Sequence, residues 1–227
     1  THKNILVPFD FNEQAHIALG QSYNLARMLK LEITLLYVYE EGGMFNKFFS
    51  ADQSDELIKK MENELEAFSS AKSKETGLKI NYLVARGKVH AKIVEVAELI
   101  QSEFVIMGKE SNFNLYAPNV GANTSRVIRN AKCPVITISA ESHYNGCRSI
   151  LLPIDLTQES RQKVSWGIEL AKMFGATIKV VTVLWSVNHK EIKSSLTAKM
   201  LQVKKFIEER NIKCTAEMIE AAKESDM

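Results

Sequence analysis

The sequence is poor in the residues that cross-link, break or metallate a chain. Its 227 residues include three cysteines, ten glycines and four prolines. Cys133, Cys147 and Cys214 lie far apart and form no CxxC pair, which excludes a zinc ribbon and a thioredoxin-type site. The five histidines show no HxxxH or HExxH spacing, so a metal site is not expected. We therefore expect reduced thiols in a cytoplasmic protein.

An excess of charge and a long apolar run are also missing. The 29 Lys and Arg residues nearly balance 27 Asp and Glu, for a net charge of +2, which argues against nucleic-acid binding through bulk charge. The apolar run at residues 33–38 is far shorter than the about 20 residues of a membrane span. The N-terminus has no apolar signal-peptide core. We expect a soluble protein with neither a nucleic-acid nor a membrane partner.

An internal repeat organises the chain. The segment NILVPFD at residues 4–10 reappears as SILLPID at residues 149–155, an offset of 145. Two further pairs match at the same offset: residues 25–29 with 170–174, and 33–38 with 178–183. This predicts a first unit at residues 1–140, a linker at 141–147 and a second unit at 148–227.

The apolar pattern of the first unit alternates between strand and helix. Strands are predicted at residues 4–9, 32–39, 78–85, 104–107 and 135–138, and helices at 13–30, 56–74, 91–101 and 124–130. Strands that alternate with helices form βαβ units. The pattern therefore predicts the α/β class, with a parallel sheet and helices on both faces.

The second unit is expected to be incomplete in this chain. Residues 212–218 are similar to residues 78–84, but the copies then diverge, with Glu220 matched to Glu95. We expect part of a loop and the terminal βαβ segment of this unit to be missing from the sequence.

Candidate binding residues follow three predicted strands, at the sheet edge where open parallel sheets bind ligands. Asp10 is placed either to accept a hydrogen bond from an amine such as that of adenine, or to help cap the helix that follows. Val38 ends the second strand and is otherwise a core residue. The strand ending at Met107 runs into Gly108.

A glycine precedes the last predicted helix of this unit. Gly121 is followed by Ala122, Asn123 and Thr124, and Thr124 is predicted to be the N-cap. Free amides at a helix N-terminus bind phosphate, although a glycine before a helix is also common in plain turns.

The strand ILVPFD, the later segment GKESNFNLYAPNVGANTSRVIRNAKCPVITI and the tandem repeat resemble the universal stress protein family. That family carries the motif G-x2-G-x9-G-[ST], here at positions 108, 111, 121 and 122. The resemblance implies Rossmann-like, flavodoxin-like units with a five-stranded parallel sheet, often dimeric, and in one branch an ATP bound at the carboxyl edge. By position, Asp10 and Val38 would contact adenine, and Pro8, Met107 and Gly108 would shape the pocket. The four residues Gly121, Ala122, Asn123 and Thr124 would face ribose and phosphates.

Two positions depart from the motif. Ser111 replaces the second glycine, and Ala122 replaces the serine or threonine. A side chain at position 111 disfavours a positive φ and crowds a phosphate. Ala122 removes a hydroxyl donor, a loss of about 0.5–1.5 kcal/mol. A weakened nucleotide site and an inactive one both agree with these changes.

Two functions follow from the resemblance. The first is a stress-response regulator that binds ATP, with magnesium, or a related adenine nucleotide. The alternative is a nucleotide-free module that dimerises, as a pseudo-dimer of the two units or a homodimer, through the apolar segment 134–138. The sequence lacks GxxxxGK[ST], GxGxxG and GxSxG motifs. We therefore expect no enzyme, or at most a slow ATPase.

Overall fold

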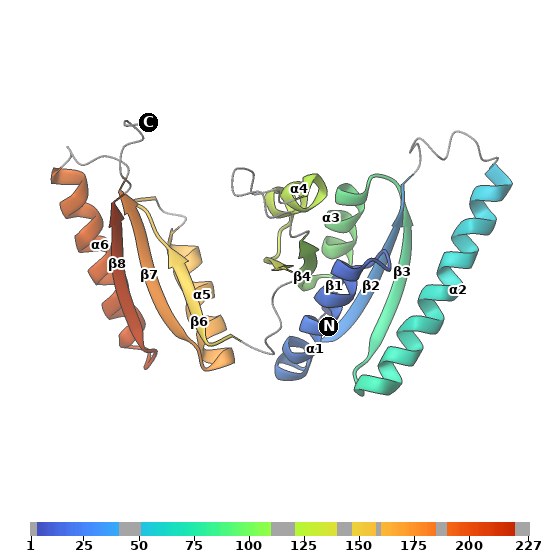
Figure 1. The fold of residues 1–227 in the computed structure, drawn as a ribbon, viewed down its shortest axis with the longest axis horizontal. Coiled ribbons are helices and arrows are strands. Elements are labelled where there is room, and N and C mark those ends of the chain that lie inside the picture. Colours follow the sequence, from blue (N-terminus) through green and yellow to red (C-terminus); the bar gives the residue numbers. More distant parts are fainter. Residues whose placement is uncertain are drawn as a thin grey trace. The chain divides into compact units, whose positions relative to one another are not determined.

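The computed structural model describes residues 4–40, 51–109, 121–139, 147–157, 160–184 and 190–220, and gives no side-chain detail at positions 51–54, 109, 161 and 190. The chain divides into two compact units, at residues 1–145 and 146–227. Each unit is described by itself (Figure 1).

The first unit is built on a parallel sheet of five strands in the order β3-β2-β1-β4-β5. The strands are β1 (Asn4–Pro8), β2 (Glu32–Tyr39), β3 (Ile80–Arg86), β4 (Ser102–Lys109) and β5 (Val135–Ser139). A buried hydrogen bond of 2.9 Å from the Thr34 hydroxyl to the Asn4 side chain joins β1 to β2. The α/β prediction is confirmed.

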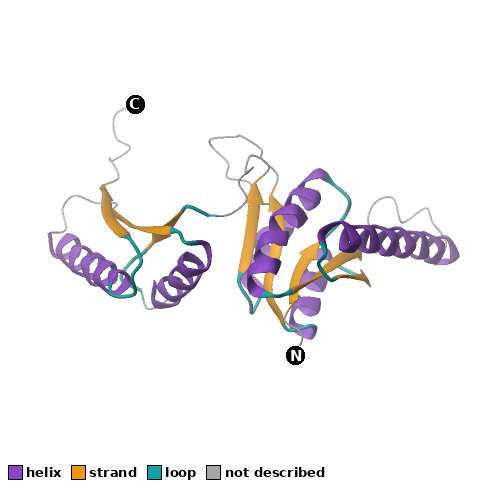
Figure 2. Cartoon of the chain, turned by 90° about the horizontal axis from the view of Figure 1, so that it is seen from below, coloured by secondary structure: helices purple, strands orange, loops and turns teal. Residues whose placement is uncertain are grey.

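The helices of the first unit cover both faces of this sheet (Figure 2). They are α1 (Glu13–Leu29), α2 (Ala51–Thr76), α3 (Val89–Leu99) and α4 (Ala122–Asn130). One face, which carries Leu6, Leu36 and Val105, packs on Ile93 of α3 and Val127 of α4. The other two helices contact the sheet separately, α1 over β1 and β4, and α2 over β3 and β2.

The ends of α1 follow from local chemistry. Asn12 has an extended backbone, and its side-chain oxygen accepts a hydrogen bond of 2.7 Å from the amide of Ala15, which satisfies an otherwise unpaired helix amide. Lys30 ends the helix in the left-handed conformation, at φ 54°. Other bounds moved by a few residues, and α2 begins five positions before the predicted Glu56.

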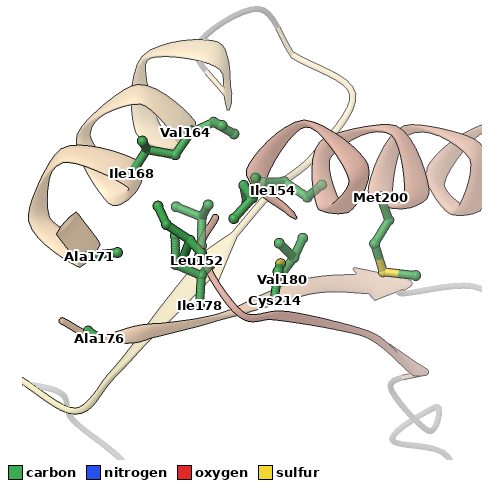
Figure 3. Close-up of a cluster of buried hydrophobic side chains, with 12 residues drawn as sticks. Leu152, Ile154, Val164, Ile168, Ala171, Ala176, Ile178, Val180, Met200 and Cys214 are labelled. Carbon is green, nitrogen blue, oxygen red and sulfur yellow. The ribbon is translucent and has the colours of Figure 1, made fainter. Parts of the chain in front are cut away.

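The second unit has a parallel sheet in the order β6-β7-β8 within its described residues. Its elements are β6 (Ser149–Pro153), α5 (Ser160–Phe174), β7 (Thr177–Leu184), α6 (Lys190–Glu208) and β8 (Cys214–Glu220). Both helices lie on one face of the sheet (Figure 2) and enclose a core that includes Val164, Ile168 and Met200 (Figure 3). On α5, Trp166 is 42% exposed.

Strand registers relate the two units. Ser149 pairs with Thr177 as Asn4 pairs with Glu32, a shift of 145. Ile178 pairs with Cys214 as Ile33 pairs with Ile80, and this last strand is shifted by 134.

The predicted match of Glu220 with Glu95 is wrong. Strand β8 continues unbroken to Glu220, which pairs with Leu184. With the shift of 134, the residue of the first unit equivalent to Glu220 is Arg86, the last residue of β3, whereas Glu95 lies in α3.

Among the described residues, no helix combines the length and apolar character that crossing a bilayer requires.

A tight contact joins α1 to β4. A Cβ atom added to Gly108 would overlap the backbone carbonyl of Gln14 and lie 2.7 Å from the Gln14 Cβ. We expect Gly108→Ala to lower the free energy of unfolding by about 1–3 kcal/mol, because neither backbone has room to move. Gly20→Ala is the matched control, because nothing lies within 4 Å of a Cβ there, and it should gain about 0.5–1 kcal/mol. Denaturant unfolding followed by circular dichroism compares the two, and equal effects would contradict the contact.

A polar network closes the turn between β6 and α5. The Asp155 carboxylate accepts hydrogen bonds from the amide of Thr157 at 2.9 Å, from the hydroxyl of Ser160 at 2.8 Å and from the hydroxyl of Thr157. These bonds, the Thr157 hydroxyl foremost, hold the pKa of Asp155 well below its usual range.

We expect this network to stabilise the protein only while Asp155 is ionised. A depressed folded-state pKa contributes stability above the unfolded pKa, and this is lost as the pH falls below about 4. Asp155→Asn should therefore melt below the wild type at about pH 7, and the gap should shrink at about pH 3. A gap in melting temperature that is constant with pH would show that ionisation is not involved.

Candidate functional site

The site lies where the direction of strand order changes. Strand β1 has β2 on one side and β4 on the other, so the connections that leave β1 and β4 run in opposite directions. Such a switch point opens a crevice at the carboxyl ends of the strands. Figure 1 shows β1 and β4 at the centre of the first unit, with α4 above β4.

Of the predicted pocket residues, Pro8, Val38 and Met107 lie on one face of the sheet, whereas Gly108 faces α1 on the other. Pro8 pairs with Leu36, and Val38 pairs with Ala85. Val38, Ala85 and the buried Met107 belong to one apolar cluster, which packs against α3 and α4. Because alternate residues share a face, Pro8 is on this face too. The sheet therefore presents an apolar surface at its carboxyl end on the α4 side.

Asp10 is exposed at the end of β1. Its carboxylate oxygens accept two hydrogen bonds from Asn12, at 3.2 Å from the backbone amide and 2.9 Å from the side-chain amide. Asp10 thus orients the N-cap residue and is not itself the cap. Burial, and after it the Asp10 carboxylate, raises the pKa of Tyr37, so the charge of Asp10 reaches β2.

Gln14 is the residue that the sequence analysis missed. It lies in the first turn of α1 against Gly108, and its Oε1 atom is buried with no hydrogen-bond partner among the described residues. A buried acceptor without a partner costs about 1–3 kcal/mol, and burial keeps this oxygen away from solvent. The only sequence signal was a polar side chain two residues after the N-cap.

Helix α4 packs on the opposite face of the sheet from α1. Its N-cap is Gly121, with φ −48° and ψ 148°, and no side chain of the described residues makes a cap hydrogen bond there. The prediction that Thr124 is the N-cap is wrong, because α4 already begins at Ala122 and Thr124 is the third helical residue, buried against the fold. Ala122 and Asn123 are exposed, so the first turn presents backbone amides to solvent. Ser111 lies outside the described residues.

The chemistry of this crevice fits an adenine nucleotide. The apolar surface suits a base, the exposed Asp10 carboxylate can accept a hydrogen bond, and the turn at Gly121 favours phosphate through its amides and helix dipole. In the part of the chain that the structure describes, no three His, Cys, Asp or Glu side chains gather to hold a metal ion. Any magnesium in this crevice would therefore need ligands from the nucleotide or from elsewhere.

The fold and crevice define a Rossmann-like α/β protein. The model of the universal stress protein family matches residues 1–139, and the chain belongs to that family.

Two proteins of one organism are similar to about three fifths of the chain each. Universal stress protein MJ0577 of Methanocaldococcus jannaschii is 27% identical over 157 residues, which cover 62% of this chain and 97% of that protein. Universal stress protein MJ0531 of the same organism is 29% identical over 141 residues, covering 60% of this chain and 82% of that protein.

A solved structure matches almost the whole chain. A universal stress protein from Archaeoglobus fulgidus covers 98% of this chain with a TM-score of 0.76 and 18% identity, and 80% of that protein is matched. At this identity the likeness concerns the fold alone.

Proposed function

We propose that the first unit binds ATP or a related adenine nucleotide and acts as a stress-response regulator. The observation that carries the proposal is the turn of α4 at Gly121, placed at the switch point of a universal stress protein sheet. The described part of the second unit is proposed to repeat β1, β2 and β3 of the same fold, on the basis of the shared strand register.

Each residue has a role in this proposal. The base lies on the surface formed by Pro8, Val38 and Met107, and its exocyclic amine donates to Asp10. Asp10 retains acceptor capacity, because each carboxylate oxygen has two lone pairs and Asn12 uses one on each. The amides of Ala122, Asn123 and Thr124 bind phosphate oxygens.

Binding without rapid turnover is the proposed chemistry. The first turn of α4 offers Ala122, Asn123 and Thr124, none of which is a general base. Magnesium would enter with the nucleotide and neutralise its phosphates. Signalling would then follow from the bound state and not from hydrolysis.

Gly121→Val tests the site directly. Among the described residues, a Cβ added at this position meets only the Thr124 hydroxyl, at 4.0 Å, so the protein should fold normally while the methyl groups block the amides of α4. We expect magnesium ATP to bind the wild type saturably in isothermal titration, and to bind Gly121→Val at least about tenfold more weakly.

The control is Gly20→Val, the same change on an exposed position of α1 with nothing within 4 Å. It should leave affinity unchanged. No heat under conditions that detect a dissociation constant of about 0.1 mM, or equal binding by Gly121→Val, would refute the proposal.

Ala122→Ser restores the hydroxyl that the family motif carries. If the nucleotide phosphates lie at this turn, the added donor should tighten binding about twofold to tenfold, as expected for one hydrogen bond of about 0.5–1.5 kcal/mol. Ala91→Ser, at an exposed position in the first turn of α3, adds a hydroxyl to a different helix and should change nothing. Equal affinity of Ala122→Ser and the wild type would place the phosphates elsewhere.

The second candidate is a nucleotide-free module that pairs through β5. This strand is at the edge of the sheet, and an edge strand can pair with another copy. The titration separates the candidates, because a module of this kind gives no binding heat and releases no nucleotide when it is denatured.

A further inference from the structure

The second unit contains a groove that is lined by residues of α5, α6 and the turn before α5. Its volume is about 770 Å³, within the range of small-molecule sites. Its apolar lining includes Leu156 from the turn before α5, Val164 from α5, and Val203 and Phe206 from α6. Figure 3 shows Val164 on α5, above the core that α5 and α6 share.

The first unit fills the equivalent space with aromatic rings. Phe9 and Phe68 are stacked with ring centroids 4.9 Å apart. Phe11 packs edge-on against both, at 5.1 and 5.8 Å. His16 completes the cluster at 4.9 Å from Phe9 and 5.4 Å from Phe68. These four rings wedge the N-terminal end of α1 against α2.

The strand registers identify the matching positions in the second unit. The shift of 145 relates Phe9, Phe11 and His16 to Ile154, Leu156 and Arg161, and the shift of 134 relates Phe68 to Gln202. The second shift holds at the end of the helix as well, because Gly77 and Asn211 both have a left-handed backbone, at φ 69° and 60°.

No ring occupies any of the four positions in the second unit. Leu156 and Gln202, which replace two of the phenylalanines, both line the groove. The groove therefore corresponds to space that aromatic side chains fill in the first unit, and a flat ring system fits such a space. Aromatic rings in such a slot gain from offset or edge-on packing.

The charge of the groove selects an anion. Lys199 is the one charged residue among the described residues that line it. The Lys199 ammonium donates a hydrogen bond of 2.9 Å to the Thr157 carbonyl, and an ammonium has two further N–H donors to offer a ligand. The Asp155 carboxylate nearby is bonded to Thr157 and Ser160.

We propose that this groove binds a planar aromatic compound that carries an acidic group. The rings occupy the slot between Leu156, Val164 and Val203, and the acid accepts a hydrogen bond from Lys199. The Arg210 guanidinium carbon lies 3.4 Å from the centroid of the Phe206 ring, which holds that ring in place beside the ligand.

The test uses two fluorescent probes that differ in one group. 8-Anilinonaphthalene-1-sulfonate combines a planar naphthalene ring system with an acidic sulfonate, and N-phenyl-1-naphthylamine has the same rings without the sulfonate. We expect both to bind the full chain at one saturable site. Lys199→Gln should weaken the sulfonate probe about tenfold, the effect of one hydrogen bond to a charged group, and leave the neutral probe unchanged.

Filling the groove provides the second variant. Leu156→Phe combined with Gln202→Phe restores rings at the positions of Phe11 and Phe68, and it should abolish binding of both probes without lowering the melting temperature. Gln162→Phe is the matched control, since it adds a ring to an exposed site of α5 outside the groove lining, and it should bind as the wild type does.

Several results would overturn the proposal. They are the absence of saturable binding, probe binding that persists in the filled variant, and loss of binding in Gln162→Phe as well. If the filled variant does not fold, the test is the binding of the two probes to Lys199→Gln. An equal loss of affinity for both probes would refute the role assigned to Lys199.

Discussion

The contact between Gln14 and Gly108 is the constraint on which the first unit depends. The first turn of α1 lies so close to the end of β4 that a single methyl group at position 108 has no room. This approach seats α1 over β1 and β4, with the N-cap at Asn12 and the Asp10 carboxylate just after the end of β1. The glycine of the family motif therefore has a packing role here, besides any role towards a ligand.

The elements that were predictable are those with a periodic apolar pattern. The strand at residues 32–39 agrees with the structure to the residue, because continuous burial in a parallel sheet leaves a continuous apolar run. Helix ends were less predictable. Thr124 has the preferred chemistry of an N-cap, but backbone geometry gives that position to Gly121. Gln14 was not found because its significance comes from contact with a residue 94 positions later in the chain.

The two units share a backbone pattern and differ in how they fill it. Strand pairing in the second sheet repeats the pairing of β1, β2 and β3, which local apolar patterns determine. The contents of the space between the two helices depend on a few side chains from distant segments, four rings in one unit and aliphatic or polar groups in the other. A repeat search compares strands first and overlooks such a difference.

The division of the chain into two units also separates its chromophores. All six tyrosines precede residue 146, where the second unit begins, and both tryptophans, Trp166 and Trp185, follow it. Light absorbed by tryptophan alone therefore excites only the second unit, and its emission responds to events in that unit. Each half of this molecule has its own intrinsic spectroscopic signal, so the cohesion of one half can be followed while the other remains intact.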